Sequence, residues 1–389
     1  MILRLFFLMV VAVSQLTQAE QIRVATFNVS MEATNYVERD QPVNGDELFE
    51  LLATGDNQQI KNIAAIIQRV RPDIILLNEF DYTPDPDKGV KAFIHNYLNI
   101  AQQGSEAIDF PYFYVAPVNT GVDSGVDLDR DGQKTGVKGD AFGFGFYPGH
   151  FGMVLLSRFP IDGDDVRTFQ HFLWKDMPDN LMVKTVDAEG QPWYLPETQK
   201  VMRLSSKSHW DVPVKVQGKT IHILASHPTP PVFDGPEDRN GKRNHDEVRF
   251  WVDYLGSDYD ASYIYDDNGQ KGGFNDQRFV LLGDLNSSMA EGDSFKTAIA
   301  SLLTHTRVNG RAIPHSQGGQ QHTPDNPLAG THTAGWRMRA DYVLPSEKGF
   351  KVIGSGIFWP TTDEPDYALI KDRNSSSDHR LVWLDLEIK

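Results

Sequence analysis

The chain has 389 residues, with 37 basic and 53 acidic side chains, a formal net charge of −16 and no cysteine. This length can bury a large core in one domain or two. The acidic balance argues against a broad basic face that grips nucleic acid backbones, and it favours divalent cation binding. Without cysteine there is no disulfide framework, so stability has to come from core packing.

The N-terminal residues 1–19 have the pattern of a secretory signal peptide. Arg4 is the only charge, residues 5–13 form an apolar block, and Ala19 ends a small-residue cleavage site. The apolar block is shorter than a bilayer-spanning helix requires. We therefore expect an exported chain, periplasmic or secreted, that starts at Glu20. We expect no transmembrane segment and no obligate protein partner.

The first elements after this segment indicate an α/β protein. The alternating segment 21–28 predicts a strand that ends at Asn28. Apolar residues recur at helical spacing over 57–70, and the apolar segment 73–79 predicts a buried strand that ends in Glu79. The order strand, helix, strand is typical of a layered α/β architecture.

The middle of the chain combines an irregular segment with further strands. Residues 82–150, rich in glycine, aspartate and aromatic residues, show no clean period and are predicted to be an insertion. Residues 151–159 return to a strand pattern. The segments 203–216 and 219–226 predict paired strands joined by a Gln-Gly turn. No repeat or linker divides residues 20–389, so we expect one domain.

The octet 279–286, Phe-Val-Leu-Leu-Gly-Asp-Leu-Asn, is the most informative segment. An apolar run this short suits a strand buried on both faces, and Gly283 permits a sharp exit from it. Because strand positions i and i+2 point the same way, Asp284 and Asn286 would converge at the strand end. A carboxylate acceptor beside an amide donor can hold a water and a substrate oxygen together.

The C-terminal part supplies the last predicted elements. Helices are expected at 240–255 and 293–303, and strands at 340–344, 351–358 and 380–388. Several predicted strands end in, or lead directly into, polar residues of a restricted kind. These residues are Asn28, Glu79, His227, Asp284, Asn286, Asp341, Asp378 and His379. Taken singly, each is more often a turn former, a helix cap or a structural histidine.

As an ordered set, these strand ends resemble the endonuclease/exonuclease/phosphatase (DNase I-like) superfamily. The matching segments are 25–28, 73–79, 225–227, 282–286, 340–344 and 377–379. The resemblance covers nearly all of the chain after the signal peptide. It implies a four-layer α/β sandwich, in which two packed, mainly antiparallel sheets are flanked by helices.

The resemblance also implies an enzyme, a metal-dependent hydrolase of phosphoester bonds. The residues carried over as ligands of Mg²⁺ or Mn²⁺ are Asn28, Glu79 and Asp378, whose oxygens suit a hard cation. The residues carried over as catalytic are His227, Asp284, Asn286, Asp341 and His379. In the family pattern Asp284 would orient or deprotonate the attacking water, and Asp341 would orient His379.

The substrate is expected to be a nucleic acid or a small phosphoester. A nuclease or phosphodiesterase is slightly favoured, and the alternative is a small-molecule or lipid-headgroup phosphatase. A non-catalytic binding module on the same fold is less favoured, because every expected catalytic residue type is present.

Four basic residues are candidates for binding substrate phosphate. Alternation places Arg203, Lys207 and His209 on one face of a predicted strand. Arg243 lies in the unusually charged segment 234–249. The competing interpretations are an ordinary polar sheet face and a solvated loop that leads into an amphipathic helix.

A second, structural metal site is predicted in the insertion. Asp127, Asp129 and Asp131 alternate ahead of a glycine, like the start of a calcium loop. The twelfth position is Lys138 instead of glutamate, which excludes a complete EF-hand. A partial Ca²⁺ site, completed by Asp123 or Asp140, and a plain acidic turn are the two interpretations left open.

Overall fold

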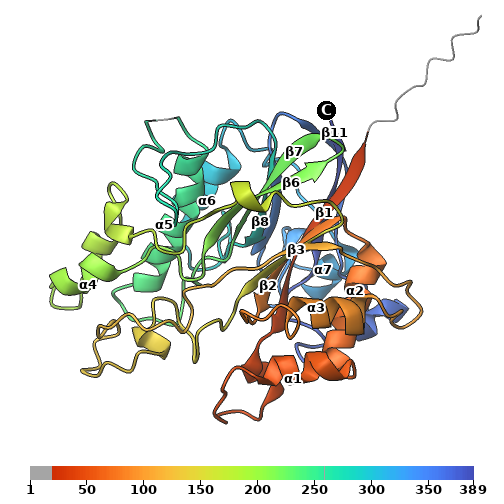
Figure 1. The fold of residues 1–389 in the computed structure, drawn as a ribbon, viewed down its shortest axis with the longest axis horizontal. Coiled ribbons are helices and arrows are strands. Elements are labelled where there is room, and N and C mark those ends of the chain that lie inside the picture. The colour runs from red at the N-terminus through yellow and green to blue at the C-terminus, as the bar shows by residue number, and fades with distance from the viewer. Residues whose placement is uncertain (1–19, 258) are drawn as a thin grey trace, which may run out of the picture.

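In a computed structural model, which describes residues 20–257 and 259–389, two β-sheets pack face to face with helices on both outer sides (Figure 1). The strands are β1 Gln21–Met31, β2 Ile74–Phe80, β3 Tyr112–Tyr114, β4 Met153–Ser157, β5 Arg167–Thr168, β6 His209–Val216, β7 Lys219–Ser226, β8 Phe279–Asp284, β9 Asp341–Pro345, β10 Phe350–Ile357 and β11 Val382–Ile388. The helices are α1 Glu47–Thr54, α2 Gln58–Val70, α3 Val90–Phe93, α4 Pro196–Val201, α5 Arg239–Tyr254, α6 Lys296–Leu303 and α7 Gln317–His322. Short 3₁₀ turns lie at 33–36, 138–140, 163–165, 174–176, 182–184, 329–331 and 365–369, and a π-helical turn lies at 94–98. The predicted signal peptide lies outside the described residues.

The first sheet has six strands in the order β10-β11-β1-β2-β4-β3. β1 and β2 run parallel, with Asn28 opposite Asn78, and the other neighbours are antiparallel. The last strand, β11, lies beside the first, so Thr26 faces Val382. The ends of β1 and β2 and the start of β11 therefore reach the same rim of the sheet.

The second sheet has five strands in the order β5-β6-β7-β8-β9. Here β7 and β8 are the parallel pair, and β9 returns antiparallel so that Asp341 lies opposite Asp284. Gly283 has a φ of +152°, and a side-chain carbon at this position would lie 2.0 Å from the Ser226 carbonyl oxygen. Only glycine lets β8 approach the end of β7 this closely.

Helices cover the outer faces, and this confirms the predicted four-layer sandwich. One continuous apolar cluster joins the inner faces of both sheets to helix α2, whose residues Ile60, Ile63 and Ile67 are fully buried. A second cluster joins the outer face of the second sheet to α5 and α6, with Trp251 at its centre. In Figure 1, α5 and α6 lie on one side of the strands and α2 and α3 on the other.

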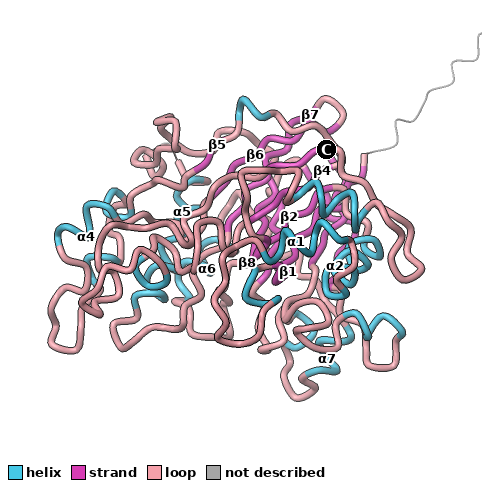
Figure 2. The backbone as a smooth tube through the Cα atoms, turned by 60° about the horizontal axis from the view of Figure 1, so that its bottom comes forward, coloured by secondary structure: helices cyan, strands magenta, loops and turns pink. Residues whose placement is uncertain are grey.

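Long loops account for much of the chain outside the sheets (Figure 2). Within residues 82–150, α3 and the π-helical turn precede β3, which pairs with β4 at the edge of the first sheet. The rest of that segment is mostly turns and isolated bridges. No helix in the described part of the chain is long and apolar enough to cross a membrane.

The predicted strand 203–216 starts six residues late, at His209. Before His209, the backbone does not pair with β7 and forms hydrogen bonds with other segments. The Leu204 carbonyl accepts from Arg243 Nε at 2.8 Å, and Ser206 N donates to Glu247 Oε1 at 2.6 Å. Alternating polar residues suggested a strand, but α5 supplies the partners that a neighbouring strand would have supplied.

Candidate active site

The parallel pairs β1–β2 and β7–β8 bring the predicted catalytic residues to one rim between the sheets. Asn28 lies near the end of β1, His227 follows β7, and Asp284 ends β8. Asp341 begins β9, and His379 lies three residues before β11. All five side chains are at most 3% exposed. The rim is therefore a buried polar site built from the ends of five strands.

Asp284 lies at the centre of this site. Its Oδ2 accepts from Asn28 Nδ2 at 3.2 Å and lies 3.5 Å from both His227 Nε2 and His379 Nε2. Its backbone nitrogen donates to Asn78 Oδ1 at 3.2 Å, which links the second sheet to β2. One carboxylate oxygen thus faces an amide and two imidazoles.

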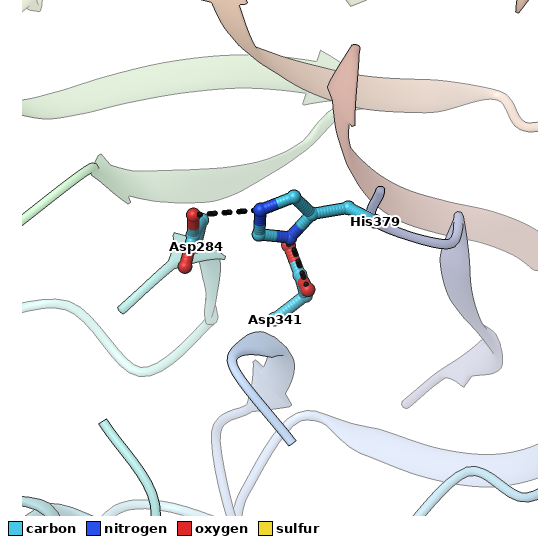
Figure 3. Close-up of side chains that lie close together, drawn as sticks. All are labelled: Asp284, Asp341 and His379. Atoms are coloured by element: carbon cyan, nitrogen blue, oxygen red, sulfur yellow. Dashed lines mark hydrogen bonds and ion pairs between the residues drawn. The ribbon is translucent and has the colours of Figure 1, made fainter. Parts of the chain in front are cut away.

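His379 lies between two carboxylates, Asp341 on its Nδ1 side and Asp284 on its Nε2 side (Figure 3). Nδ1 is 2.9 Å and 3.1 Å from the two Asp341 oxygens. Burial disfavours the charged ring, but Asp341 and Asp284 outweigh it and raise the pKa of His379 to about 10. The exposed indole of Trp336 packs edge-on against this imidazole, with ring centroids 4.6 Å apart.

His227 is the neutral counterpart of His379. Burial, followed by the positive charges of Lys207 and His379, lowers its pKa well below the ordinary value. Neither ring nitrogen has a hydrogen-bond partner among the described residues. Buried polar atoms in folded proteins are nearly always paired. His227 is therefore available to a ligand.

Burial and neighbouring carboxylates make Asp284 a weaker acid. Burial is the main cause, and the charges of Asp341 and Glu79 add to it while His379 opposes, so that the pKa of Asp284 rises to about 7. Burial likewise raises the pKa of Glu79, against the charge of His379. A carboxylate with a pKa near neutrality is suited to accept a proton from water.

The three predicted ligands of the catalytic metal lie on the first-sheet side of the rim. Glu79 is half-buried, has a left-handed backbone with a φ of +54°, and forms no ion pair within the described part of the chain. Asn28 Oδ1 accepts from Ser30 N at 3.2 Å. Asp378 lies 3.7 Å from Arg373 Nη1 and accepts from Ser30 Oγ at 3.4 Å.

The set of side chains fits a hard divalent cation, since the Glu79 carboxylate, which has no ion pair among the described residues, and the Asn28 amide oxygen lie at one rim. A second set of possible ligand atoms, from Asp284, Asp341 and His379, lies within 4.8 Å of one another. That set excludes Glu79 and Asp378. The ligand assignment therefore stays a prediction.

Asn286 lies beside Asp284, and both its backbone nitrogen and its side-chain amide form hydrogen bonds within the protein. Its own nitrogen donates to Asp284 Oδ1 at 3.0 Å, and its Nδ2 donates to the Pro228 carbonyl at 3.2 Å. Its φ of +49° is a left-handed conformation that asparagine tolerates better than most residues. Asn286 thus fixes the exit from β8 beside the catalytic carboxylate.

Two supporting residues were missed from the sequence. Asn78 Oδ1 accepts from Asp284 N and from Thr26 Oγ1, while its buried Nδ2 has no partner in the part of the chain that the structure describes. Thr333 Oγ1 donates to Asp341 Oδ2 at 2.7 Å and accepts from the Asp341 nitrogen at 3.0 Å. Asn78 directly precedes Glu79 within an apolar strand, a signal that a polar residue there has a buried partner.

Three of the four basic candidates, Arg203, His209 and Arg243, make structural contacts. Arg243 donates to the carbonyls of residues 203 and 204, and His209 lies between Ser205 Oγ at 2.6 Å and the Glu247 carbonyl at 2.9 Å. Arg203 donates to Asn119 Oδ1 and lies over the Phe142 ring. These contacts do not support phosphate binding by the three. Lys207 is 5% exposed, and burial lowers its pKa.

The acidic loop of the insertion brings together two of the three predicted aspartates and Asp140, one of the two residues that were expected to complete the site. Asp127, Asp129 and Asp140 bring carboxylate oxygens within 4.8 Å of one another, and Asp131 is not part of the group. Asp140 is 1% exposed and accepts from the Leu128 nitrogen at 2.8 Å. The chain folds back on itself there, so the third carboxylate comes from later in the sequence.

The fold and the rim together define a DNase I-like α/β sandwich. The family model described as "Endonuclease/Exonuclease/phosphatase family" matches residues 25–379, from the first strand to His379. The chain belongs to the endonuclease/exonuclease/phosphatase family, whose members hydrolyse phosphoester bonds with the help of divalent metals. No curated protein sequence matches the chain significantly.

Several solved structures are similar in fold. An endonuclease/exonuclease/phosphatase from Beutenbergia cavernae DSM 12333 is 17% identical with a TM-score of 0.50, and the match covers 95% of this chain and 72% of that one. The human Nocturnin catalytic domain with bound sulfate is 13% identical (TM-score 0.44, 95% of each chain). Sphingomyelinase C from Streptomyces griseocarneus is 14% identical (TM-score 0.43, 94% of this chain and 99% of that one).

Proposed function

We propose that this protein is an exported, divalent-metal-dependent hydrolase that uses a water molecule to cleave a phosphodiester or a phosphomonoester. The proposal rests mainly on one observation, the clustering of Asn28, His227 and His379 around a single oxygen of Asp284. Asp284 therefore faces an amide donor and two imidazoles, and its pKa is about 7. Such a carboxylate can accept the proton of an attacking water.

The two histidines have complementary roles in this proposal. His379, kept protonated by Asp341, can donate a hydrogen bond to a phosphoryl oxygen or a proton to the leaving oxygen. His227 is neutral and has no hydrogen-bond partner among the described residues, so it can hold a second phosphoryl oxygen or the attacking water. Asn28 fixes the Asp284 carboxylate, and Asn286 fixes the turn beside it.

Glu79, with Asn28 and Asp378, would hold Mg²⁺ or Mn²⁺. When bound, the ion supplies positive charge that neutralises the phosphoryl group during attack. Glu79 suits this role because it lies at the rim without an ion-pair partner among the described residues.

A nuclease or phosphodiesterase is slightly favoured over a small-molecule or lipid-headgroup phosphatase. The exposed Trp336 ring beside His379 supports an organic group on the phosphate, since bases stack well on aromatic rings. A non-catalytic binding module remains the least favoured alternative.

An activity panel with and without metal tests the proposal. It compares plasmid DNA, RNA, bis-p-nitrophenyl phosphate, p-nitrophenyl phosphate and a choline phospholipid. Asp284→Asn should lower the preferred activity by about 10²–10⁴-fold, whereas Asp164→Asn, at an exposed carboxylate, should not change it. Full activity in Asp284→Asn, or after exhaustive chelation, would contradict the proposal.

Two further assignments belong to this proposal. Export rests on the signal peptide pattern of residues 1–19, and N-terminal sequencing of the mature protein should find Glu20 first. A separate Ca²⁺ site in the acidic loop is supported by the grouping of Asp127, Asp129 and Asp140, with Asp140 replacing Asp131.

A further inference from the structure

Two phenylalanine rings of the insertion are exposed to solvent as a pair. They belong to residues 141–151, called the aromatic segment below. Phe144 is 56% and Phe146 is 36% exposed, and their rings pack edge to face with centroids 5.7 Å apart. The glycines that alternate with them, Gly143 and Gly145, are buried. Single exposed apolar residues are common on protein surfaces, whereas adjoining ones more often mark an interaction site.

The two glycines let the backbone of the aromatic segment approach other segments closely. A side-chain carbon on Gly143 would lie 2.0 Å from the Ser206 carbonyl oxygen. A side-chain carbon on Gly145 would lie 2.6 Å from the Gly121 nitrogen. The Gly143 carbonyl accepts from Gly121 N at 2.9 Å, and the Gly145 carbonyl accepts from Lys138 N at 2.7 Å. The buried side of the segment is therefore fixed, and the two phenylalanines are carried on its other side.

One part of the aromatic segment lies on the His227 side of the proposed active site. Gly143 approaches the carbonyl of Ser206 closely, and Ser206 Oγ donates to the His227 carbonyl at 3.4 Å. The pairing of β6 with β7 continues from there, with His209 opposite Ser226. Phe144, the residue after Gly143, is thus close to the second-sheet side of the rim.

The other part of the aromatic segment lies on the Glu79 side. Tyr147 Oη donates to Asp81 Oδ2, and Phe151 N donates to Asp81 Oδ1 at 3.0 Å. Asp81 follows the end of β2, two residues after Glu79. The aromatic segment therefore extends from the His227 side of the rim to the Glu79 side, and it carries the two exposed rings between these ends.

The charge beside the rings favours a nucleic acid strand over an apolar chain. The Lys138 ammonium lies 5.4 Å from the centroid of the Phe146 ring. Proteins that bind single strands combine aromatic rings that stack on bases with cations that attract the phosphates. An apolar chain would cover the rings and leave the ammonium without an anion. The exposed Trp336 ring, beside His379, offers another stacking surface at the rim.

We propose that Phe144 and Phe146 stack on unpaired nucleobases that flank the phosphodiester held at the rim, so that the preferred substrate is a single-stranded nucleic acid. This inference rests on the proposed function and names its substrate class. In a duplex the bases stack on one another, so only an unpaired strand offers their faces to a side chain. Because the backbone that carries the rings is already fixed, few groups have to be ordered when a strand binds.

The test measures binding without cleavage. Phe144→Ala/Phe146→Ala is made in the full chain that also carries Asp284→Asn, and Mg²⁺ is present. Fluorescence anisotropy gives the affinity for a labelled oligothymidine, for an abasic oligonucleotide of the same length, and for the oligothymidine paired with its complement. Phe144→Leu/Phe146→Leu, which keeps apolar side chains without flat rings, is a second variant.

Tyr112→Ala is the matched control, because this tyrosine is another exposed aromatic residue, at 39%. It lies opposite Ser157, which pairs with Ile74 at the start of β2. Asn78, near the rim, is at the other end of that strand. The control therefore removes an aromatic ring of similar exposure far from the proposed site.

The alanine and leucine variants should both weaken oligothymidine binding by about tenfold or more, since stacking on each base is lost. Their affinity for the abasic strand should equal that of the parent protein, and the parent should bind the duplex more weakly than the single strand. Tyr112→Ala should change none of these affinities.

An equal loss of affinity for the base-bearing and abasic strands would overturn the inference, because the rings would then not contact bases. Unchanged oligothymidine binding in the alanine variant would overturn it too. So would a loss confined to binding of phosphatidylcholine vesicles, which would mark a membrane contact. The proposed function fails by a different result, namely a folded wild-type protein that hydrolyses no phosphoester in the panel. Since the affinities are measured without hydrolysis, the two failures are distinguishable.

Discussion

Replacing Gly283 by alanine probes how closely the two parallel strands of the second sheet must approach at the rim. The added carbon would lie 2.0 Å from the Ser226 carbonyl oxygen, whereas ordinary van der Waals contact begins near 3.4 Å. The contact is with backbone, so no side chain can rotate away and β8 has to move by about 1 Å or more. Overpacking of this kind costs about 1–3 kcal/mol.

The displacement would also affect the catalytic carboxylate, which is the next residue. The hydrogen bond from Asp284 N to Asn78 Oδ1, now 3.2 Å long, would be stretched or lost, at a further cost of about 1 kcal/mol. We therefore expect Gly283→Ala to lower the free energy of unfolding by about 2–4 kcal/mol. A misplacement of about 1 Å should lower kcat by about a hundredfold.

Urea denaturation measures the first effect and kcat on bis-p-nitrophenyl phosphate the second. Gly163→Ala is the matched control, since a carbon added there meets nothing within 4 Å, and the free energy of unfolding should change by no more than about 0.5 kcal/mol. If Gly283→Ala were as stable and as active as this control, the close approach of β7 and β8 would not matter to the site.

Three further predictions concern charges. Burial lowers the pKa of His222, but the hydrogen bond and charge of Asp211 raise it above the ordinary value. The pair therefore adds to the free energy of unfolding below the unfolded-state pKa of His222, and this contribution is lost as the pH rises through the folded-state pKa. Asp211→Asn should therefore lower the free energy of unfolding more at pH 6 than at pH 8, and an equal loss at both would refute this. Asp341→Asn should lower the pKa of His379, so the alkaline limb of the pH–kcat profile should move to lower pH, and an unmoved limb would exclude His379 as the acid. Titration of the metal-free protein with Ca²⁺ should give a heat signal that Asp127→Asn removes, and equal signals in both would exclude the acidic-loop site.

The elements that could be predicted are those whose pattern is local. The strands around 74–80 and 279–284 are apolar runs bounded by glycine, proline or polar residues, and their positions follow from burial on both faces. Helix α2 follows equally well from its periodic isoleucines. The order of strand ends also predicted which polar residues share a rim.

What could not be predicted depends on partners that are distant in sequence. Asn78 is 206 residues from Asp284, and no local pattern shows that its amide supports the catalytic carboxylate. The segment before His209 alternates like a strand, yet Glu247 in α5 takes its backbone hydrogen bond. Asp140, named with Asp123 as a residue that could complete the acidic-loop site, joins Asp127 and Asp129, but spacing along the chain did not show that Asp131 would stay outside the group.

The position of β11 between β10 and β1 determines when the first sheet can be completed during synthesis and folding. Asn28 and His379 come from opposite ends of the chain, and Ser377 Oγ donates to the Asn28 carbonyl at 2.8 Å. The first sheet is therefore incomplete until the last strand, β11, has paired with β1. A growing chain, or one cut short by a protease near its C-terminus, lacks both a strand of the first sheet and His379. The rim that joins Asn28 to His379 can therefore form only once nearly the whole chain is available.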